Sequence, residues 1–364
     1  MDSLLRSALQ RGKAYEDLPL RLQQSISLGE YQSAVQHFWI QQGEDWGVSP
    51  ACSACGEQEY YEELIRSYKA WMRLFPYHLS GYVCRVMRLT PAKYYHDMLV
   101  AALTQEKPYH QIPNFTAADA LRLLGVGRNE YIATLNACKG RRLLWRVNRS
   151  SVARDMLPYA PKDHRIEPWW TVSVVNIGES EYRELDAEEV AHLKTASGPG
   201  PEHVTCCADL RPAVLRSLLR KGLVYVEVPV ALSHRFSIPP LDGFVSNKDA
   251  AAGLGGGGGA APASAAADPV EGLLYAVFVA NSERLTVADL ASMLAVRPDA
   301  VCAALALASR LGFATRVHPP VDPRQAAYLN PGSAADMGRG SSSSLGTPGQ
   351  ADLLGLEQGG PGGG

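Results

Sequence analysis

The sequence predicts a mainly α-helical protein with small β wings, in which tandem winged-helix-like units follow an N-terminal helical region. Three observations favour this fold class. Apolar residues recur at helical spacing, a segment of 32 residues returns at an offset of 170, and three segments each read helix, helix, strand. Where a further helix precedes that series, the order is typical of a winged helix, which is a helix-turn-helix variant.

The N-terminal region, residues 1–88, contains one strongly periodic stretch. Tyrosine and aliphatic side chains recur every three or four positions over residues 57–75, opposite a charged face, and this predicts an amphipathic helix that ends at Pro76. Thr90 followed by Pro91 predicts the start of the next helix, because a hydroxyl N-cap precedes proline at the first helical position. That helix opens the first winged-helix-like unit.

The repeated segment begins with Thr116-Ala-Ala-Asp119 and returns as Thr286-Val-Ala-Asp289. This spacing predicts a capping box at a helix start in both copies. Each copy then predicts a second helix, over 128–139 and 298–310, followed by a strand over 143–147 or 313–317. Nine of the 32 aligned residues are identical, mostly at capping or core positions. We interpret the repeat as structural, although unrelated helix–turn–helix units also converge on similar apolar positions.

A weaker third copy lies between these two. Asp186 and Glu189 predict a capped short helix, residues 210–221 predict a second helix that ends at Gly222, and alternating valines over 223–230 predict a half-buried strand. The predicted domains are the N-terminal helical region (1–88), the first unit (89–165), a central α+β unit (166–249), a flexible Ala/Gly linker (250–267), the second clear unit (268–320) and a disordered low-complexity tail (321–364).

Composition limits the classes of protein to which the chain can belong. Its 364 residues carry a net charge of −2, and the longest fully apolar stretches have eight residues, far short of the roughly 20 that a membrane-spanning helix needs. No secretory signal is readable at the N-terminus. Seven dispersed cysteines do not resemble a disulfide framework, so we expect a reducing, cytoplasmic environment.

Motifs for catalysis or cofactor binding are weak. Gly125-Val-Gly127 follows a predicted helix and lacks a third glycine, so we do not expect a nucleotide site. Cys52-x-x-Cys55 has zinc-like spacing but needs two further ligands, with Cys206, Cys207 and His203 as distant candidates; incidental cysteines in a loop are favoured. We therefore predict no catalytic residue, no metal and no cofactor, and that the protein is not an enzyme.

Residues 121–165 form a basic segment, with ten Lys/Arg against three Asp/Glu. The candidate docking patch within it comprises Lys139, Arg141, Arg142, Arg146 and Arg149. One interpretation is a winged-helix nucleic-acid-binding protein that uses this segment; the other is a surface for an acidic protein or an anionic lipid. The predicted recognition helix of the second clear unit lacks Asn, Gln and Lys, which favours protein docking.

Several strings resemble one known family. They are YYEEL at 60–64, FPYHLS at 75–80, RLTP at 88–91, PNFTAAD at 113–119, LRLLGVGRN at 121–129, ARD at 153–155, WW at 169–170, KG at 221–222, PPLDGFV at 239–245 and RLGF at 310–313. Together they resemble the N-terminal domain of the "family with sequence similarity ninety-one" proteins over roughly residues 15–320. Residues 113–132 are the most specific part.

This resemblance implies a non-catalytic cytosolic adaptor that is peripherally associated with the trans-Golgi network and with vesicles. Its implied role is vesicle capture and tethering in endosome-to-Golgi transport, and its implied partners are a TBC-domain adaptor and a WD-repeat trafficking complex. The sequence departs from the family in the Cys52–Cys55 loop, in the linker at 250–267, and in ending with low complexity where the family continues into a large C-terminal half. The resemblance carries over no individual binding residue.

Overall fold

The computed structural model describes residues 2–141, 148–198, 204–239 and 269–317. The predicted strand at 143–147, the linker at 250–267, the tail at 321–364, and both Arg142 and Arg146 lie outside the described residues. Within the described part, helices dominate, and the strands form one three-stranded and one two-stranded sheet. The predicted class, mainly α with small β elements, is confirmed.

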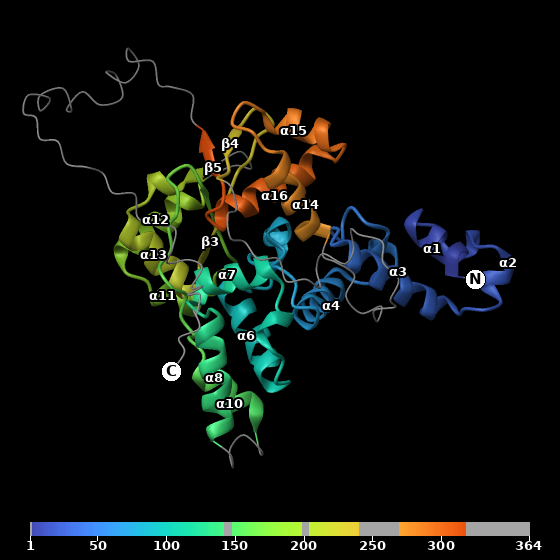
Figure 1. The fold of residues 1–364 in the computed structure, drawn as a ribbon, viewed down its shortest axis with the longest axis horizontal. Helices are drawn as coiled ribbons and strands as arrows, with labels where there is room; N and C mark the ends of the chain where they lie inside the picture. The colour runs from blue at the N-terminus through green and yellow to red at the C-terminus, as the bar shows by residue number, and fades with distance from the viewer. Residues whose placement is uncertain (1, 142–147, 199–203, 240–268, 318–364) are drawn as a thin grey trace, which may run out of the picture.

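The N-terminal helices form a lobe at one end of the molecule (Figure 1). They are α1 (Asp2–Gln10), α2 (Leu20–Gln23) and α3 (Leu28–Gln42), with the 3-10 turn η1 (Tyr15–Asp17) between the first two. Ser27 and Glu30 form a capping box at the start of α3. A small core of buried residues, including Leu22, Tyr31 and Val35, holds the lobe together.

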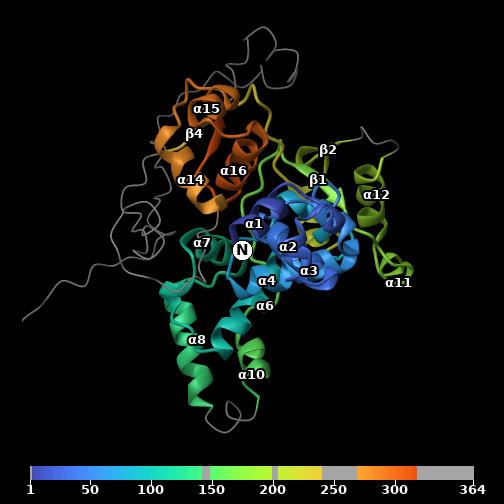
Figure 2. The same ribbon diagram turned by 90° about the vertical axis from the view of Figure 1, so that its right-hand side faces the viewer.

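The largest core lies among the helices that follow. They are α4 (Glu57–Ala70), α5 (Ser80–Val83), α6 (Pro91–Thr104), α7 (Asn114–Leu124), α8 (Arg128–Gly140) and α10 (Arg149–Met156), with the 3-10 turns η2 (Pro50–Ser53), η3 (Tyr77–Leu79) and η4 (Tyr109–Gln111). The Thr90 hydroxyl accepts a hydrogen bond from the Lys93 N–H at 3.2 Å, which confirms the predicted start of α6. In both ribbon views α6, α8 and α10 extend side by side away from the body (Figures 1 and 2).

The predicted helix over 57–75 is too long, because α4 ends at Ala70 rather than at Pro76. Met72 takes a left-handed conformation, with φ 54°, and turns the chain away from the helix axis. The segment that follows, residues 72–75, packs against α6. The Tyr94 hydroxyl donates to the Arg73 carbonyl at 2.8 Å, and the Phe75 N–H donates to the Tyr95 hydroxyl at 3.0 Å.

The second clear unit, which is the third unit along the chain, contains α14 (Pro269–Ala280), α15 (Val287–Leu294) and α16 (Pro298–Arg310), followed by β5 (Thr315–Val317). The strand predicted over 313–317 is present but shorter, because it begins at Thr315. It pairs antiparallel with β4 (Arg235–Ser237), which precedes the linker in sequence, so Phe236 faces Arg316. No single described helix is long and apolar enough to cross a membrane; α15 and α16 meet that criterion only as a pair, bent by 117°.

Three helix boundaries in the two repeat copies agree with the offset of 170, whereas the starts of α7 and α15 do not. Helices α7 and α15 end at Leu124 and Leu294, and α8 and α16 begin and end at equivalent positions. After α7 and α15 the chain turns through a left-handed residue, Gly125 with φ 71° and Ala295 with φ 52°.

The predicted capping boxes differ between the copies. In α15 the prediction is confirmed, because the Thr286 hydroxyl accepts from the Asp289 N–H at 3.2 Å and Asp289 Oδ2 accepts from the Thr286 N–H at 3.0 Å. In α7 the prediction is wrong. That helix starts at Asn114, two residues before Thr116, so Thr116 and Asp119 lie inside it and are buried.

The central unit is built on an antiparallel sheet with strand order β2–β1–β3. It contains β1 (Thr171–Val174), α11 (Glu179–Arg183), α12 (Ala187–Ala196), β2 (Thr205–Cys206), the 3-10 turn η5 (Cys207–Asp209), α13 (Pro212–Lys221) and β3 (Val224–Glu227). The predicted cap at Asp186 and the predicted helix end at Gly222, with φ 70°, are both confirmed.

The prediction that the strand over 223–230 is half-buried is wrong, because β3 is buried on both faces. Val224 and Val226 pack into the core of the central unit, whereas Tyr225 packs into the core of the helices before it. This strand therefore connects two cores, and alternation of valines alone did not indicate the second one.

Candidate functional site

A groove of about 330 Å³ lies where the loop after α4, the end of β3 and helices α14 and α16 meet. Its walls are mainly apolar and include Phe75, Val228, Val230, Ala306 and Leu307. The cation Arg310 and the carboxylate Glu227 also line it. Glu227 is held in place, because its Oε1 accepts a hydrogen bond from the Ser80 hydroxyl at 2.7 Å.

Arg310 ends α16 and joins three segments at the base of the groove. Its Nη2 donates to the Val226 carbonyl at 2.6 Å, and its guanidinium lies 4.1 Å from the centre of the Tyr77 ring and 5.7 Å from that of Trp170. Burial lowers the pKa of Arg310 from its ordinary value. Arginine nevertheless remains protonated in proteins, so a buried positive charge faces the groove.

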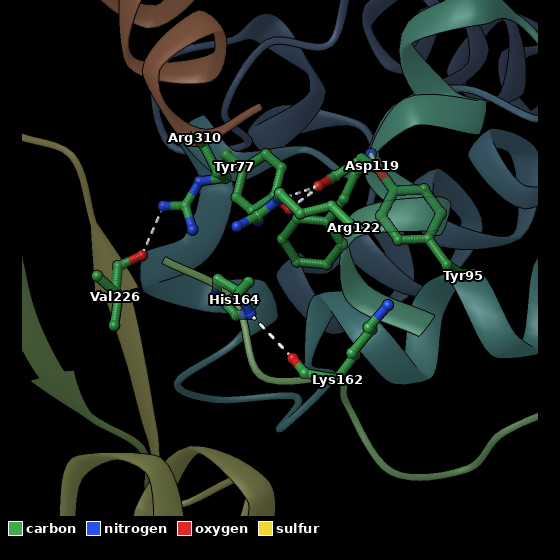
Figure 3. A network of polar contacts seen from close by, with 9 residues as sticks. Tyr77, Tyr95, Asp119, Arg122, Lys162, His164, Val226 and Arg310 are labelled. Carbon is green, nitrogen blue, oxygen red and sulfur yellow. Dashed lines mark hydrogen bonds and ion pairs between the residues drawn. The ribbon is translucent and has the colours of Figure 1, made fainter. Parts of the chain in front are cut away.

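A buried polar network lies directly behind Arg310 (Figure 3). The Tyr77 hydroxyl donates to Asp119 Oδ2 at 2.5 Å, and Arg122 Nε donates to Asp119 Oδ1 at 3.1 Å. The Asp119 side chain is fully buried and that of Arg122 is 11% exposed. Burial would lower the pKa of Arg122, but Asp119 and Tyr77 together outweigh it and raise that pKa. Asp119 thus compensates a buried cation and fixes Tyr77 beneath Arg310.

His164 lies beside the same network (Figure 3). Its Nδ1–H donates to the Lys162 carbonyl at 3.2 Å. Burial, together with the positive charge of Arg122, lowers the pKa of His164 to about 4. The imidazole is therefore neutral at physiological pH, which avoids a third cation beside Arg122 and Arg310.

The structure describes three residues of the predicted docking patch, and their surroundings differ. Lys139 Nζ lies 2.9 Å from Glu106 Oε2 and Arg149 Nη1 lies 3.0 Å from Glu106 Oε1, so these two cations share one acidic partner on the turn after α6. Arg141 is exposed at the end of α8. Arg142 and Arg146 lie outside the described residues. Whether these residues bind a partner stays a prediction.

Other cations of the basic segment have partners within the protein. Arg122 pairs with Asp119, and Arg165 Nε lies 2.6 Å from Glu167 Oε1. A phosphate-binding face requires cations that are free to contact the backbone of a nucleic acid. Because four of the ten cations in the segment pair with acidic residues of the protein itself, the nucleic-acid interpretation is not favoured.

The cysteines are dispersed among the described residues. Cys52 is exposed in η2, whereas the Cys55 thiol donates to the Ala51 carbonyl at 3.5 Å. Burial raises the pKa of Cys55 to about 11 and that of Cys207 to about 12. Among the described residues, no group of three or more His, Cys, Asp or Glu could hold a metal ion; His203 lies outside them.

Sequence reasoning did not identify Tyr77, Asp119, Arg122 or Arg310 as a joint site. One local signal was present: Arg122 follows Asp119 by three residues, so both lie on one face of a helix and can pair. No local pattern connects this pair with Tyr77 or with Arg310, which are 42 and 191 residues from Asp119.

The comparison with known families agrees with the strings quoted above. The family described as "FAM91 N-terminus" matches residues 8–328, which span the N-terminal lobe, the three units and the groove between them. The chain therefore belongs to the FAM91 family.

Proposed function

We propose that this chain is a non-catalytic interaction module of an adaptor that captures and tethers endosome-derived vesicles at the trans-Golgi network. The observation that carries the proposal is the FAM91 match over residues 8–328. By family resemblance, its partners are a TBC-domain adaptor and a WD-repeat trafficking complex. Membrane association is then peripheral and depends on these partners.

The groove is our candidate for the surface that receives the TBC-domain partner. Its apolar walls suit buried side chains of an incoming segment, and Arg310 supplies one fixed positive charge. Among the described residues, Arg310 contacts a carbonyl oxygen and aromatic rings and forms no ion pair. We therefore propose that the partner inserts apolar side chains together with one carboxylate, since such a pair gains strength in a desolvated site.

The raised thiol pKa values are consistent with a non-catalytic role. A catalytic cysteine needs a thiolate, which is favoured by a lowered pKa and by nearby positive charge. Burial acts in the opposite direction on Cys302, the one cysteine that lines the groove, because it raises the pKa of that thiol.

The test is binding of the purified TBC-domain adaptor to the full chain and to a blocked variant. Ala303 is exposed and lines the groove, so Ala303→Trp fills the groove without disturbing a core. Ala213 is exposed on α13, outside the groove, and Ala213→Trp is the matched control. We expect Ala303→Trp to weaken binding by about tenfold or more, as for a central interface position, and Ala213→Trp to leave it unchanged.

Two results would count against the proposal in different ways. If the unmodified chain does not bind the TBC-domain adaptor, the proposed adaptor role is wrong. If the chain binds but both tryptophan variants bind equally well, the role stands and the groove is not the docking surface.

A further inference from the structure

A second pocket, of about 750 Å³, lies between α6 and α10, apart from the groove. Both ribbon views show these two helices side by side (Figures 1 and 2). Its polar lining includes Lys93, His96 and Asp97 from α6, Ser150 and Arg154 from α10, and Tyr159 from the segment after α10. A volume in this range is typical of small-ligand sites.

His96 provides a buried polar atom that lacks a partner. Its side chain is 2% exposed, and its Nδ1 lies 3.6 Å from Asp97 Oδ1. The other ring nitrogen, Nε2, is buried and has no hydrogen-bond partner among the described residues. A buried polar atom without a partner destabilises the protein, because it loses its hydrogen bonds to water. Because Nδ1 faces a carboxylate oxygen, which can only accept, the proton of the neutral ring lies on Nδ1 and Nε2 is an acceptor. Since His96 lines the pocket, a ligand with a hydrogen-bond donor could satisfy this nitrogen.

The pocket carries two positive charges in excess. Asp97 is already compensated, because its Oδ2 lies 2.8 Å from Lys69 Nζ. Burial would raise the pKa of Asp97, but the neighbouring Lys69 and Lys93 outweigh it, and the pKa lies below its ordinary value. Lys93 and Arg154 are exposed at the rim, and neither forms an ion pair with a described residue. The structure therefore leaves two cations on facing helices for an anion.

We propose that the pocket between α6 and α10 binds a phosphomonoester group. Such a group carries a charge of about −1.5 to −2 near neutral pH, which matches the Lys93 and Arg154 pair. Near neutral pH two forms coexist: the dianion carries both charges, whereas the singly protonated form carries one charge and offers a P–O–H donor to His96 Nε2. In either form the Ser150 hydroxyl can donate to a phosphate oxygen. A phosphodiester carries one charge and no such proton, so it satisfies neither the second cation nor His96.

The carrier of the phosphate can be a soluble sugar phosphate or a phosphoinositide headgroup. The pocket is larger than one phosphate, and Tyr159, which is 74% exposed, places its ring 5.6 Å from the His96 ring at the pocket edge. An exposed tyrosine ring can pack against a sugar ring or lie at a lipid headgroup layer. The inference does not depend on the proposed adaptor role.

The first experiment is calorimetric titration of the full chain with inositol monophosphate, inorganic phosphate and dimethyl phosphate. We expect the two phosphates that can carry a P–O–H to bind and dimethyl phosphate not to bind. The double variant Lys93→Gln/Arg154→Gln should weaken binding by about tenfold or more, because it removes two charge-assisted contacts.

The matched control is Lys194→Gln/Arg216→Gln. It removes the same charge, again one lysine and one arginine, from exposed positions on α12 and α13, neither of which lines the pocket. We expect this control to bind like the unmodified chain. Absence of binding by the unmodified chain, equal binding of dimethyl phosphate, or equal weakening in both double variants would overturn the proposal.

A sedimentation assay then distinguishes the two phosphate sources. Vesicles of phosphatidylcholine with a phosphatidylinositol phosphate are compared with vesicles that carry matched charge from phosphatidylserine. Selective sedimentation that Lys93→Gln/Arg154→Gln abolishes identifies a lipid headgroup as the ligand. Binding of inositol monophosphate without vesicle binding identifies a soluble ligand. Sedimentation that the double variant does not alter, without binding of any soluble phosphate, would contradict the site.

Discussion

The two copies of the Thr-x-Ala-Asp motif share their spacing and the end of the helix that contains it, but they differ in where that helix starts and in what the motif does. In α15, Thr286 and Asp289 cap the helix at the protein surface. In α7, Thr116 and Asp119 lie inside the helix, and the fully buried Asp119 carboxylate holds Tyr77 and Arg122. The same four-residue pattern therefore forms a helix cap in one unit, whereas in the other its aspartate forms a buried contact with a distant segment of the chain.

The cause of this difference lies in the residues that precede the motif. Phe115 is fully buried against aromatic rings of α14. The centre of its ring lies 5.0 Å from that of Tyr275 and 5.7 Å from that of Phe278. Its N–H faces Glu271 Oε1 of α14 at 3.4 Å. A side chain from another helix thus serves the start of α7, so Thr116 and Asp119 are not needed as caps. Tertiary contact decides what the local pattern becomes.

The largest expected effect comes from removing the buried Asp119 carboxylate, which binds Tyr77 and Arg122. Asp119→Ala leaves the Arg122 cation buried without its carboxylate, and we expect a loss of about 3–5 kcal/mol in the free energy of unfolding. The matched change Asp289→Ala removes only an exposed cap and should cost several-fold less. Urea unfolding of both variants measures the difference. Equal losses would show that Asp119 does no more than Asp289.

Equivalent leucines at the ends of α7 and α15 provide a second comparison. Leu124 is buried, whereas Leu294 is only half-buried. We expect Leu124→Ala to cost about 2–5 kcal/mol, because it leaves a cavity in the core, and Leu294→Ala to cost less. Thermal unfolding of the two variants checks this order, and the reverse order would contradict the burial that we describe.

Acid should destabilise the protein by protonating His164, which lies beside the Arg122 cation of the first repeat copy. Its pKa is about 4 in the folded state against an ordinary value of 6.5, so the unfolded chain binds the proton more tightly. The stability that this group contributes is full above pH 6.5 and falls as the pH drops towards 4, by about 3 kcal/mol in total. Unfolding measured across this range should show a weaker pH dependence in His164→Gln. An unchanged profile would mean that another group titrates.

Local sequence patterns were sufficient where a helix end depends on its own residues. Thr90, Asp186, Gly222 and the capping box at Thr286 all lie where the pattern predicted them, because each satisfies nearby backbone groups. The repeat offset also predicted the boundaries of α8 and α16. These features need no information about distant segments.

Local patterns were insufficient where distant segments meet. The end of α4 at Ala70 follows from the packing of residues 72–75 against α6, and the burial of Tyr225 follows from a core that the valine alternation does not report. The groove and its Arg310 arise from segments more than 200 residues apart in sequence. The sequence did single out the basic segment, but not the internal partners that Glu106 and Asp119 provide for its cations.

The most direct test of the contrast between the two copies is the pair Thr116→Val and Thr286→Val, compared by their midpoints of urea unfolding. Thr116 Oγ1 is buried without a hydrogen-bond partner among the described residues, so valine removes a desolvated hydroxyl and should leave stability unchanged or slightly raised. Thr286→Val removes a cap and should cost about 1 kcal/mol. We therefore predict effects of different sign, or none against a clear loss. A similar loss in both variants would contradict the conclusion that the threonine caps a helix in the second copy and does not cap one in the first.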